Sequence, residues 1–334
     1  ALRRRKAELS AESFDEAARQ GVREFWSQGV SCVADTGDTG AAARALSQLG
    51  GRGIAYQEIF GPDPAQADPV IESLPGMLAE QSDQASDTVE IGVSPHAPYS
   101  VSASLYRKVA AIVRQRNLRC AVHVAESQSE WDLVTAGTGP FAAMWQARGI
   151  PEIEPAASPI ALLARSEVLA PGLLAIHCVR LSDDDITALQ RSNTSVVVCP
   201  RSNARHGHGL PRIEAMLAAG LPVALGTDSA ASVADIDIRE DARYLVDRTM
   251  VSGERAVRMF TIDAAEALRL AERIGSVEAG KDADLVVLEL SDRATATGDR
   301  PWDLVLDPRT KVAATLVKGR PRYVSADLSR ALSR

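Results

Sequence analysis

Short runs of apolar and β-branched residues alternate along this chain with longer stretches of helical periodicity. This alternation is typical of parallel βα units rather than of hairpins or helical bundles. Each run is almost continuously apolar, as expected for strands that are buried on both faces. Seven such runs precede residue 230, namely Val30–Thr36, Gly53–Phe60, Val89–Ser94, Arg119–Ala125, Leu173–Cys178, Ser195–Pro200 and Pro222–Asp228.

Seven βα units nearly fill a (β/α)8 barrel, which typically needs about 250 residues. We therefore predict an α/β fold with a TIM-type barrel that lacks its first strand in this chain, because no strand candidate precedes the helical stretch from Ser13 to Gln28. That stretch opens with a candidate capping box formed by Ser13 and Glu16. A second helix is expected from Ser102 to Asn117, with Ser102 as its N-cap.

The pattern changes after residue 275. Two further helical stretches, Asp235–Val251 and Glu254–Leu270, come before the change, and short strands without helices between them follow it, which predicts an antiparallel sheet. The strand candidates are Ala283–Leu290, Lys311–Val317 and Arg322–Val324. We expect residues 1–275 to form the barrel and residues 276–334 to form the C-terminal part of a small β-sandwich, with an absent N-terminal segment as the other part.

Composition argues against several classes of protein. The chain has 37 basic and 44 acidic residues, which gives a formal charge of −7. This charge lacks the excess of basic residues that binding to a nucleic acid polymer requires. No run of about 18 apolar residues and no export signal occurs, so we expect a cytoplasmic protein without a membrane partner. The four cysteines lack CxxC spacing and are predicted to be buried free thiols: Cys32, Cys120, Cys178 and Cys199.

Histidines and carboxylates cluster where the predicted strands end. Barrel enzymes carry their chemistry at the C-terminal ends of the strands. Imidazole and carboxylate groups are also the ligands that a catalytic zinc or iron requires. A single histidine at a strand end is more often a hydrogen-bonded structural residue. Several histidines and carboxylates at neighbouring strand ends are better explained by a shared catalytic or metal-binding role. The set comprises His96, His123 with Glu126, His177 and Asp228.

Two loop segments are weaker candidates. Ser202 and Asn203 follow the sixth run, where they either line the site or satisfy the backbone of a turn. His206 and His208 lie with Arg205 in a glycine-containing loop, so a mobile or substrate-facing loop is favoured over metal ligation. No GxGxxG, Walker A or GxSxG motif has the required strand-turn-helix context, which argues against dinucleotide, P-loop and serine-hydrolase chemistry.

Six motifs occur together in the order and spacing of a known family. The chain resembles the amidohydrolase superfamily, and within it the branch of adenosine-type deaminases and chlorohydrolases. The segments at 57–64 and 126–141 look most like aminodeoxyfutalosine deaminases and deaminases of 5'-modified adenosines, such as methylthioadenosine and S-adenosylhomocysteine. The motifs are SPHAPYS at 94–100, HVAES at 123–127, IHC at 176–178, CPRSN at 199–203, LGTDSAAS at 225–232 and GSVEAGKDADLVVL at 275–288.

The resemblance implies a role for each residue of the cluster. It implies that His123 and Asp228 bind one divalent metal, with His177 completing the metal site or contacting the metal-bound water, and with zinc preferred and iron as the alternative. It implies that Glu126 shuttles protons, with His177 and Asp228 as catalytic partners. His96, Glu126 and Asn203 would contact substrate. The family's HxH ligand pair of the first strand is absent here, so we expect an incomplete metal site in this chain and a missing N-terminal segment.

The function implied by the resemblance is hydrolytic deamination of an aminopurine nucleoside, a 5'-modified adenosine such as aminodeoxyfutalosine, with release of ammonia. Alternatives within the family are s-triazine chlorohydrolysis and deamination of guanine or cytosine. A different class of function, an inactive barrel used for binding or assembly, also stays open because the HxH pair is absent. The expected partner is a small nucleoside or heterocycle, and the sequence leaves a homodimer open.

Overall fold

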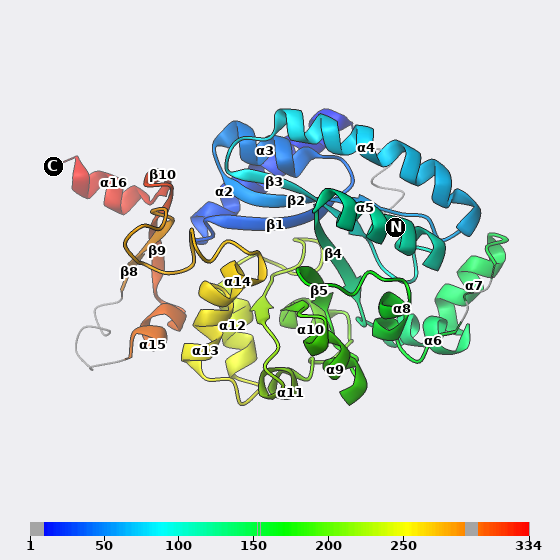
Figure 1. The fold of residues 1–334 in the computed structure, drawn as a ribbon. Helices are drawn as coiled ribbons and strands as arrows, with labels where there is room; N and C mark the ends of the chain where they lie inside the picture. Colours follow the sequence, from blue (N-terminus) through cyan, green and yellow to red (C-terminus); the bar gives the residue numbers. More distant parts are fainter. Residues whose placement is uncertain (1–9, 152, 154, 291–299, 334) are drawn as a thin grey trace.

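Seven strands form one parallel sheet in the order in which they occur along the chain. The computed structural model describes residues 10–290, except 152 and 154, and residues 300–333. The sheet curls, and helices cover its outer side (Figure 1). This sequential order differs from a doubly wound sheet, where the order reverses, so the TIM-type prediction is confirmed. The strands are β1 (Cys32–Gly37), β2 (Arg52–Ile59), β3 (Val89–Pro95), β4 (Arg119–Val124), β5 (Leu173–His177), β6 (Ser195–Val198) and β7 (Val223–Leu225).

Helices connect successive strands, and most begin at a side-chain cap. Ser102 accepts a hydrogen bond from the backbone N–H of Leu105, as predicted. The helices of the barrel are α2 (Ala11–Ser27), α3 (Ala41–Leu49), α4 (Ala67–Gln84), α5 (Ala103–Arg116), α6 (Gln128–Ala136), α7 (Gly139–Ala147), α8 (Pro159–Arg165), α9 (Asp183–Arg191), α10 (Pro200–Arg205), α11 (Ile213–Ala218), α12 (Ile238–Val246), α13 (Gly253–Met259) and α14 (Ile262–Ala267), with a 3-10 turn η1 (Pro64–Gln66).

Two predicted helix boundaries were wrong. Helix α2 is capped by Ser10, which has an extended backbone and accepts a hydrogen bond from the N–H of Ser13. Ser13 is therefore already helical and forms no capping box. The stretch predicted as one helix from Glu254 to Leu270 is divided into α13 and α14, because Thr261 has φ −120° and ψ −101°, which is not helical.

Successive residues of the sheet alternate between two hydrophobic clusters, as the two-residue period of a strand requires. One cluster, the inner cluster, lies on the concave face and includes a residue of α14. Its buried members are Ile54, Tyr56, Ala121, Leu174, Ala224 and Ala267. The second, the outer layer, packs between the strands and their helices. Its members at the ends of β4 and β5 are Val122, Val124, Ala125, Ala175 and Cys178.

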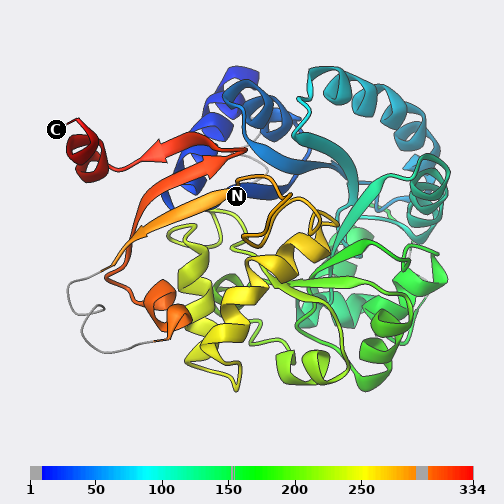
Figure 2. The same cartoon turned by 60° about the vertical axis from the view of Figure 1, so that its left-hand side comes forward.

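The tail of the chain forms a separate three-stranded antiparallel sheet, as predicted, in the order β10-β9-β8. Its strands are β8 (Leu285–Glu289), β9 (Lys311–Val317) and β10 (Arg320–Val324). The expectation of no helix between these strands was wrong, because α15 (Pro301–Leu306) separates β8 from β9, and α16 (Ala326–Leu332) follows β10. The sheet lies beside α2 (Figure 2), where the Thr315 hydroxyl donates to the Trp26 carbonyl at 2.6 Å. The boundary at residue 275 stays a prediction.

A buried arginine joins the two sheets. Arg52, at the start of β2, is only 1% exposed. Its Nε donates to Asp284 at 2.8 Å and its Nη2 donates to Asp282 at 2.7 Å. Both aspartates precede β8, so this ion-pair cluster, the Arg52 clasp, ties the amino end of the barrel to the small sheet.

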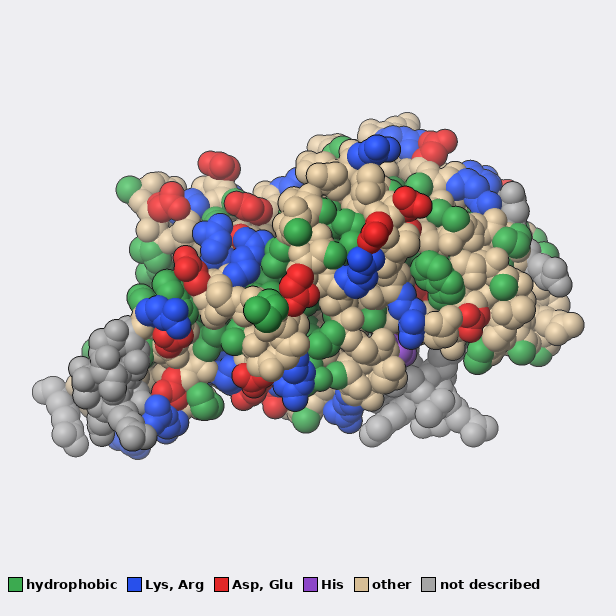
Figure 3. Space-filling model, turned by 90° about the horizontal axis from the view of Figure 1, so that it is seen from below, with side chains coloured by type: hydrophobic (Ala, Val, Ile, Leu, Met, Phe, Trp, Pro, Cys, Tyr) green, Lys and Arg blue, Asp and Glu red, His purple; other side chains and the backbone are tan. Residues whose placement is uncertain are grey.

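The surface carries charges of both signs side by side, as the face in Figure 3 shows. In the part of the chain that the structure describes, no helix has both the length and the apolar composition needed to cross a membrane. The described cysteines form no disulfide. Burial is as predicted for Cys120, Cys178 and Cys199, whereas Cys32 is only partly buried.

Candidate functional site

The carboxyl ends of neighbouring strands bring the predicted histidines together. His123 lies in β4, His177 ends β5, and His96 directly follows β3. The ring centroids of His96 and His123 are 5.0 Å apart, and those of His123 and His177 are 5.6 Å apart. The three rings therefore form a continuous row across three strands, because the ends of adjacent parallel strands meet at one edge of the sheet.

Glu126 lies between two imidazoles. Its Oε1 is 3.7 Å from Nε2 of His177 and 3.6 Å from Nε2 of His208. Burial raises the pKa of Glu126, and the nearby His208 and His123 oppose that rise. His208 comes from the loop after α10, which faces the site as the sequence favoured, and its ring stacks on His206. A carboxyl group with a raised pKa is suited to both accepting and donating a proton.

Oxygen acceptors orient two of the imidazoles. His177 Nδ1 donates to Oδ1 of the buried Asn203 at 3.0 Å, and His123 Nδ1 donates to the His96 carbonyl at 3.2 Å. Burial lowers the pKa of His177 and lowers that of His123 to about 4, so both rings are neutral at pH 7. A neutral imidazole whose Nδ1–H is held by an oxygen presents Nε2 as a ligand, which is the usual arrangement around protein-bound metals.

Asp228, three residues beyond β7, is held as a carboxylate. The Ser202 hydroxyl donates to its Oδ2 at 2.5 Å, and the Ser229 N–H donates to its Oδ1 at 2.5 Å. Burial alone would raise the pKa of Asp228, but these hydrogen bonds and the neighbouring His177 lower it below the usual value. The predicted site residue is therefore an anion beside an imidazole at neutral pH.

The backbone leaves the extended conformation abruptly at this edge. His177, Cys178 and Asp228 have φ values of +76°, +47° and +61°. Residues with a Cβ rarely adopt this left-handed region, and such strain concentrates at functional sites. Regular alternation along β5 would place the His177 side chain on the helix-covered face, on the same side as Ala175. Because of the positive φ, its ring lies beside His123 instead.

A second set of donors overlaps with the predicted metal ligands. Among the described residues, ligand atoms of Glu58, His96 and His123 all lie within 4.8 Å of one another, and this set shares only His123 with the prediction. His96 Nδ1 contacts the Ser100 hydroxyl at 2.7 Å. Sequence reasoning missed Glu58, although a carboxylate near the carboxyl end of β2 was the available signal. Imidazole and carboxylate donors fit a zinc or iron ion.

Aromatic rings border the histidine row. Tyr99 and Phe141 stack with centroids 4.3 Å apart and planes within 6° of parallel. Tyr99 also meets His96 edge-on at 5.5 Å, and Phe60 lies 4.9 Å from His96. Trp145 Nε1 donates to the Tyr99 carbonyl at 3.0 Å, which anchors the segment. Such rings offer apolar faces to a planar heterocycle.

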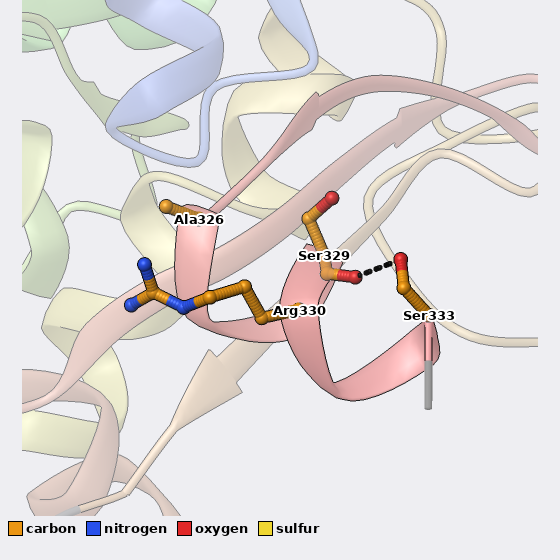
Figure 4. Close-up of a pocket in the computed structure, with 4 residues that line it drawn as sticks. All are labelled: Ala326, Ser329, Arg330 and Ser333. Atoms are coloured by element: carbon orange, nitrogen blue, oxygen red, sulfur yellow. Dashed lines mark hydrogen bonds between the residues drawn. The ribbon is translucent and has the colours of Figure 1, made fainter.

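A recess at the other side of the molecule lacks this chemistry. It lies along α16, at the outer edge of the small sheet, and is lined by Ala326, Ser329, Arg330 and Ser333 (Figure 4). Its internal hydrogen bond, from the Ser333 hydroxyl to the Ser329 carbonyl at 2.9 Å, continues the helix. Among the residues that the structure describes, no histidine or carboxylate side chain lines the recess, so the histidine row is the candidate site.

Comparison with known proteins identifies the family of this chain. The model described as Amidohydrolase family matches residues 3–322. The 5-methylthioadenosine/S-adenosylhomocysteine deaminase of Moorella thermoacetica is 29% identical over 258 residues, which cover 75% of this chain and 56% of that protein. The aminodeoxyfutalosine deaminase of Deinococcus radiodurans is 31% identical over 230 residues, covering 61% and 54%. The chain thus spans about half the length of these curated relatives.

Solved structures share the fold. An adenosine deaminase from Xanthomonas campestris with bound zinc superposes with a TM-score of 0.79 at 23% identity, covering 97% of this chain and 74% of that chain. The atrazine chlorohydrolase TrzN from Arthrobacter aurescens, complexed with zinc, gives a TM-score of 0.78 at 20% identity, covering 98% and 77%. At this level of identity the likeness concerns the architecture alone.

Proposed function

From the premise that this chain belongs to the amidohydrolase family, we propose that it hydrolyses the exocyclic amine of a 5'-modified adenosine and releases ammonia. One observation carries the proposal: the partly buried Glu126 carboxyl group lies within 4 Å of Nε2 of both His177 and His208, and burial raises its pKa. The names of the deaminases to which the chain is similar support the choice of substrate class.

We assign one divalent metal, zinc, to the site, with His123, His177 and Asp228 as its proposed ligands. The neutral imidazoles and the ionised Asp228 provide the donor types that zinc takes. When bound, the metal acts as a Lewis acid and lowers the pKa of water. The Ser202 hydroxyl donates a hydrogen bond to Asp228, and Asn203 accepts one from His177. These two bonds orient the proposed ligands.

In the proposed reaction Glu126 transfers two protons, one after the other. Its carboxylate takes a proton from the attacking water and gives it to the purine ring nitrogen. Glu126 then returns a second proton from the added hydroxyl to the leaving amine, so that water and the nucleoside become ammonia and the inosine-type product. The Oε1 atom of Glu126 lies 3.7 Å from Nε2 of His177, a proposed metal ligand, and 3.6 Å from Nε2 of His208, so the carboxyl group is next to the site where the metal and the water would bind.

The aromatic residues supply a place for the base. We propose that Phe60 and His96 face the purine and that the Tyr99–Phe141 stack borders the 5' substituent. The stack has closely parallel planes and is anchored through Trp145. A planar ligand gains contact area on such rings with little loss of side-chain freedom.

A substrate panel tests the proposal. The chain, loaded with zinc, is incubated with methylthioadenosine, S-adenosylhomocysteine, aminodeoxyfutalosine, guanine and atrazine, while ammonia and chloride are measured. We expect ammonia from one or more of the 5'-modified adenosines and its loss after chelation of the metal. Chloride release from atrazine, or ammonia only from guanine, would favour another branch of the family. No turnover of any compound by a zinc-loaded chain would contradict the proposal.

A further inference from the structure

The alternation of side chains between the two faces of the sheet is reversed where β4 ends. Alternation along the strand would place Ala125 on the inner face with His123 and turn Glu126 toward the helices. Instead, Ala125 packs in the outer layer, and Glu126 lies 3.7 Å from Nε2 of His177. The exchange takes place at Ala125 itself, whose φ of +55° is in the left-handed region. This conformation is unfavourable for a residue with a Cβ, so other contacts must hold it.

The contacts that hold it come from Glu130. This side chain is 0% exposed, and its two oxygens accept the backbone N–H groups of Ala125 and Glu126, each at 2.8 Å. Glu130 is the third residue of α6, and its own N–H donates to the N-cap Ser127 at 3.2 Å. The carboxyl group of Glu130, whose pKa burial raises to about 8, therefore extends back beyond the N-cap and accepts the two N–H groups on either side of the α-carbon of Ala125.

We propose that Glu130 is a positioning residue that sets the backbone of Ala125 and thereby aims Glu126 at His177 and His208. The inference rests on the proposed function for its effect on turnover, because Glu126 is the proposed proton carrier. Two acceptor atoms are needed, one for each N–H. A glutamine offers one acceptor oxygen and turns an NH2 group toward the second N–H, so it cannot replace the carboxylate.

A buried aspartate elsewhere provides a matched control. Asp185 is the third residue of α9 and 4% exposed, and it accepts the N–H of the N-cap Ser182 at 2.9 Å and the hydroxyl of Ser158. It occupies the same helix position as Glu130, but its carboxyl group accepts the N–H of its own N-cap residue in a capping box. The hydrogen bonds of the Asp185 side chain go to Ser182 and Ser158 rather than to Ala125 and Glu126, so its variant measures helix capping without positioning.

The experiment compares Glu130→Gln, Glu130→Gln with Ala125→Gly, and Asp185→Asn in the zinc-loaded full chain. We expect Glu130→Gln to lower kcat about 10- to 100-fold with little change in KM, because a misplaced reacting group loses rate rather than binding. Glycine adopts positive φ readily, so Ala125→Gly should restore part of kcat in the double variant. Asp185→Asn should lower thermal stability and leave kcat within about twofold of the parent chain.

Two readouts do not depend on turnover. Hydrogen exchange at the amides of Ala125 and Glu126 should become faster in Glu130→Gln, and a crystal structure of this variant should show Glu126 displaced from His177. If the parent chain deaminates no substrate, the proposed function fails, whereas these two readouts still decide the positioning role. An undisplaced Glu126, or a kcat equal to that of Asp185→Asn, would overturn the inference. If Glu130→Gln does not fold, Glu130→Asp, which shortens the reach by one methylene, takes its place with the same expected direction.

Discussion

The charged groups at the two ends of the parallel sheet differ in how they are paired. At the amino end, Arg52 is enclosed with Asp282 and Asp284, and each charge meets its opposite within 2.8 Å. At the carboxyl end, Glu126 faces imidazoles at 3.6 and 3.7 Å, and burial lowers the pKa of His177. The Arg52 clasp is thus paired at neutral pH, whereas the partly buried carboxyl group of Glu126 has no fully charged partner in His177.

This difference separates stability from chemistry. Removal of one member of a buried ion pair strongly destabilises the fold, because the remaining charge is buried without a partner. A buried group with a shifted pKa and no full partner can change its protonation state during a reaction. We therefore expect substitutions at the amino end to change the free energy of unfolding, and substitutions at the carboxyl end to change turnover or metal binding.

The largest expected effect is at Glu126. Glu126→Gln removes the group that accepts and donates protons, so turnover should fall on the order of 10² to 10⁴, with the zinc content unchanged. Ammonia release and zinc stoichiometry measured on the same sample check this outcome. Near-normal turnover in this variant would end the proposed mechanism.

Asp228→Ala is the comparison variant for Glu126→Gln. It removes a proposed ligand, so zinc content and activity should fall together. Equal loss of zinc in the two variants would mean that Glu126 binds the metal or supports the site rather than carrying protons.

A loss of similar size, but in stability, is expected at the Arg52 clasp. Arg52→Met leaves the buried Asp284 without its cation, while the partly exposed Asp282 keeps Arg273 at 3.1 Å, and should lower the free energy of unfolding by about 3 to 5 kcal/mol. Turnover per folded molecule should stay at the parent value. Denaturant unfolding measures the first quantity, and ammonia release measures the second.

The partly exposed pair of Arg44 and Asp15, 2.6 Å apart, supplies the control for the clasp. Arg44→Met should cost about 1 kcal/mol or less, since exposed pairs contribute little. Replacing Asp282 and Asp284 by Asn in the Arg52→Met chain should recover part of the lost stability. Equal costs for Arg52→Met and Arg44→Met would break the comparison between the two ends.

A smaller effect is expected from Ser202, which donates to Asp228 at 2.5 Å and is fully buried. Ser202→Ala should weaken zinc affinity roughly 10- to 100-fold, because partners of metal ligands orient those ligands. Competition with a chelator measures the affinity. Ser202→Thr retains the hydroxyl and is expected to retain more affinity; unchanged zinc binding in Ser202→Ala would remove Asp228 from the proposed ligand set.

The smallest effect concerns the contact between the small sheet and α2. Thr315→Val removes the hydroxyl that donates to the Trp26 carbonyl, and should cost about 1 kcal/mol of stability. Thr315→Ser keeps the donor and should cost less of the hydrogen-bond energy. Thermal unfolding compares the two variants, and activity should not change in either. A loss of turnover in Thr315→Val would show that the small sheet acts on the site.

The sequence by itself determined the parts of this protein that depend on local pattern. Each strand of the barrel is a short, mostly apolar run of consecutive residues, so the strand positions and their parallel order could be predicted from the sequence. The expectation that every strand is buried on both faces was wrong for β1, none of whose residues is buried. His96, His123 and His177 could be named for the same reason, because each stands at or near the end of its own run. Local signals were weaker at helix starts, where Ser10 and Ser13 offered competing caps.

Tertiary structure decided which groups meet and which way they point. Arg52 and Asp282 are 230 residues apart in the chain, and no local pattern pairs them. Glu58 and His208 join the site from a strand and a loop that only the curled sheet brings to His123 and Glu126. The direction of Glu126 depends on a positive φ at Ala125, because one left-handed residue reverses the alternation that a sequence pattern assumes.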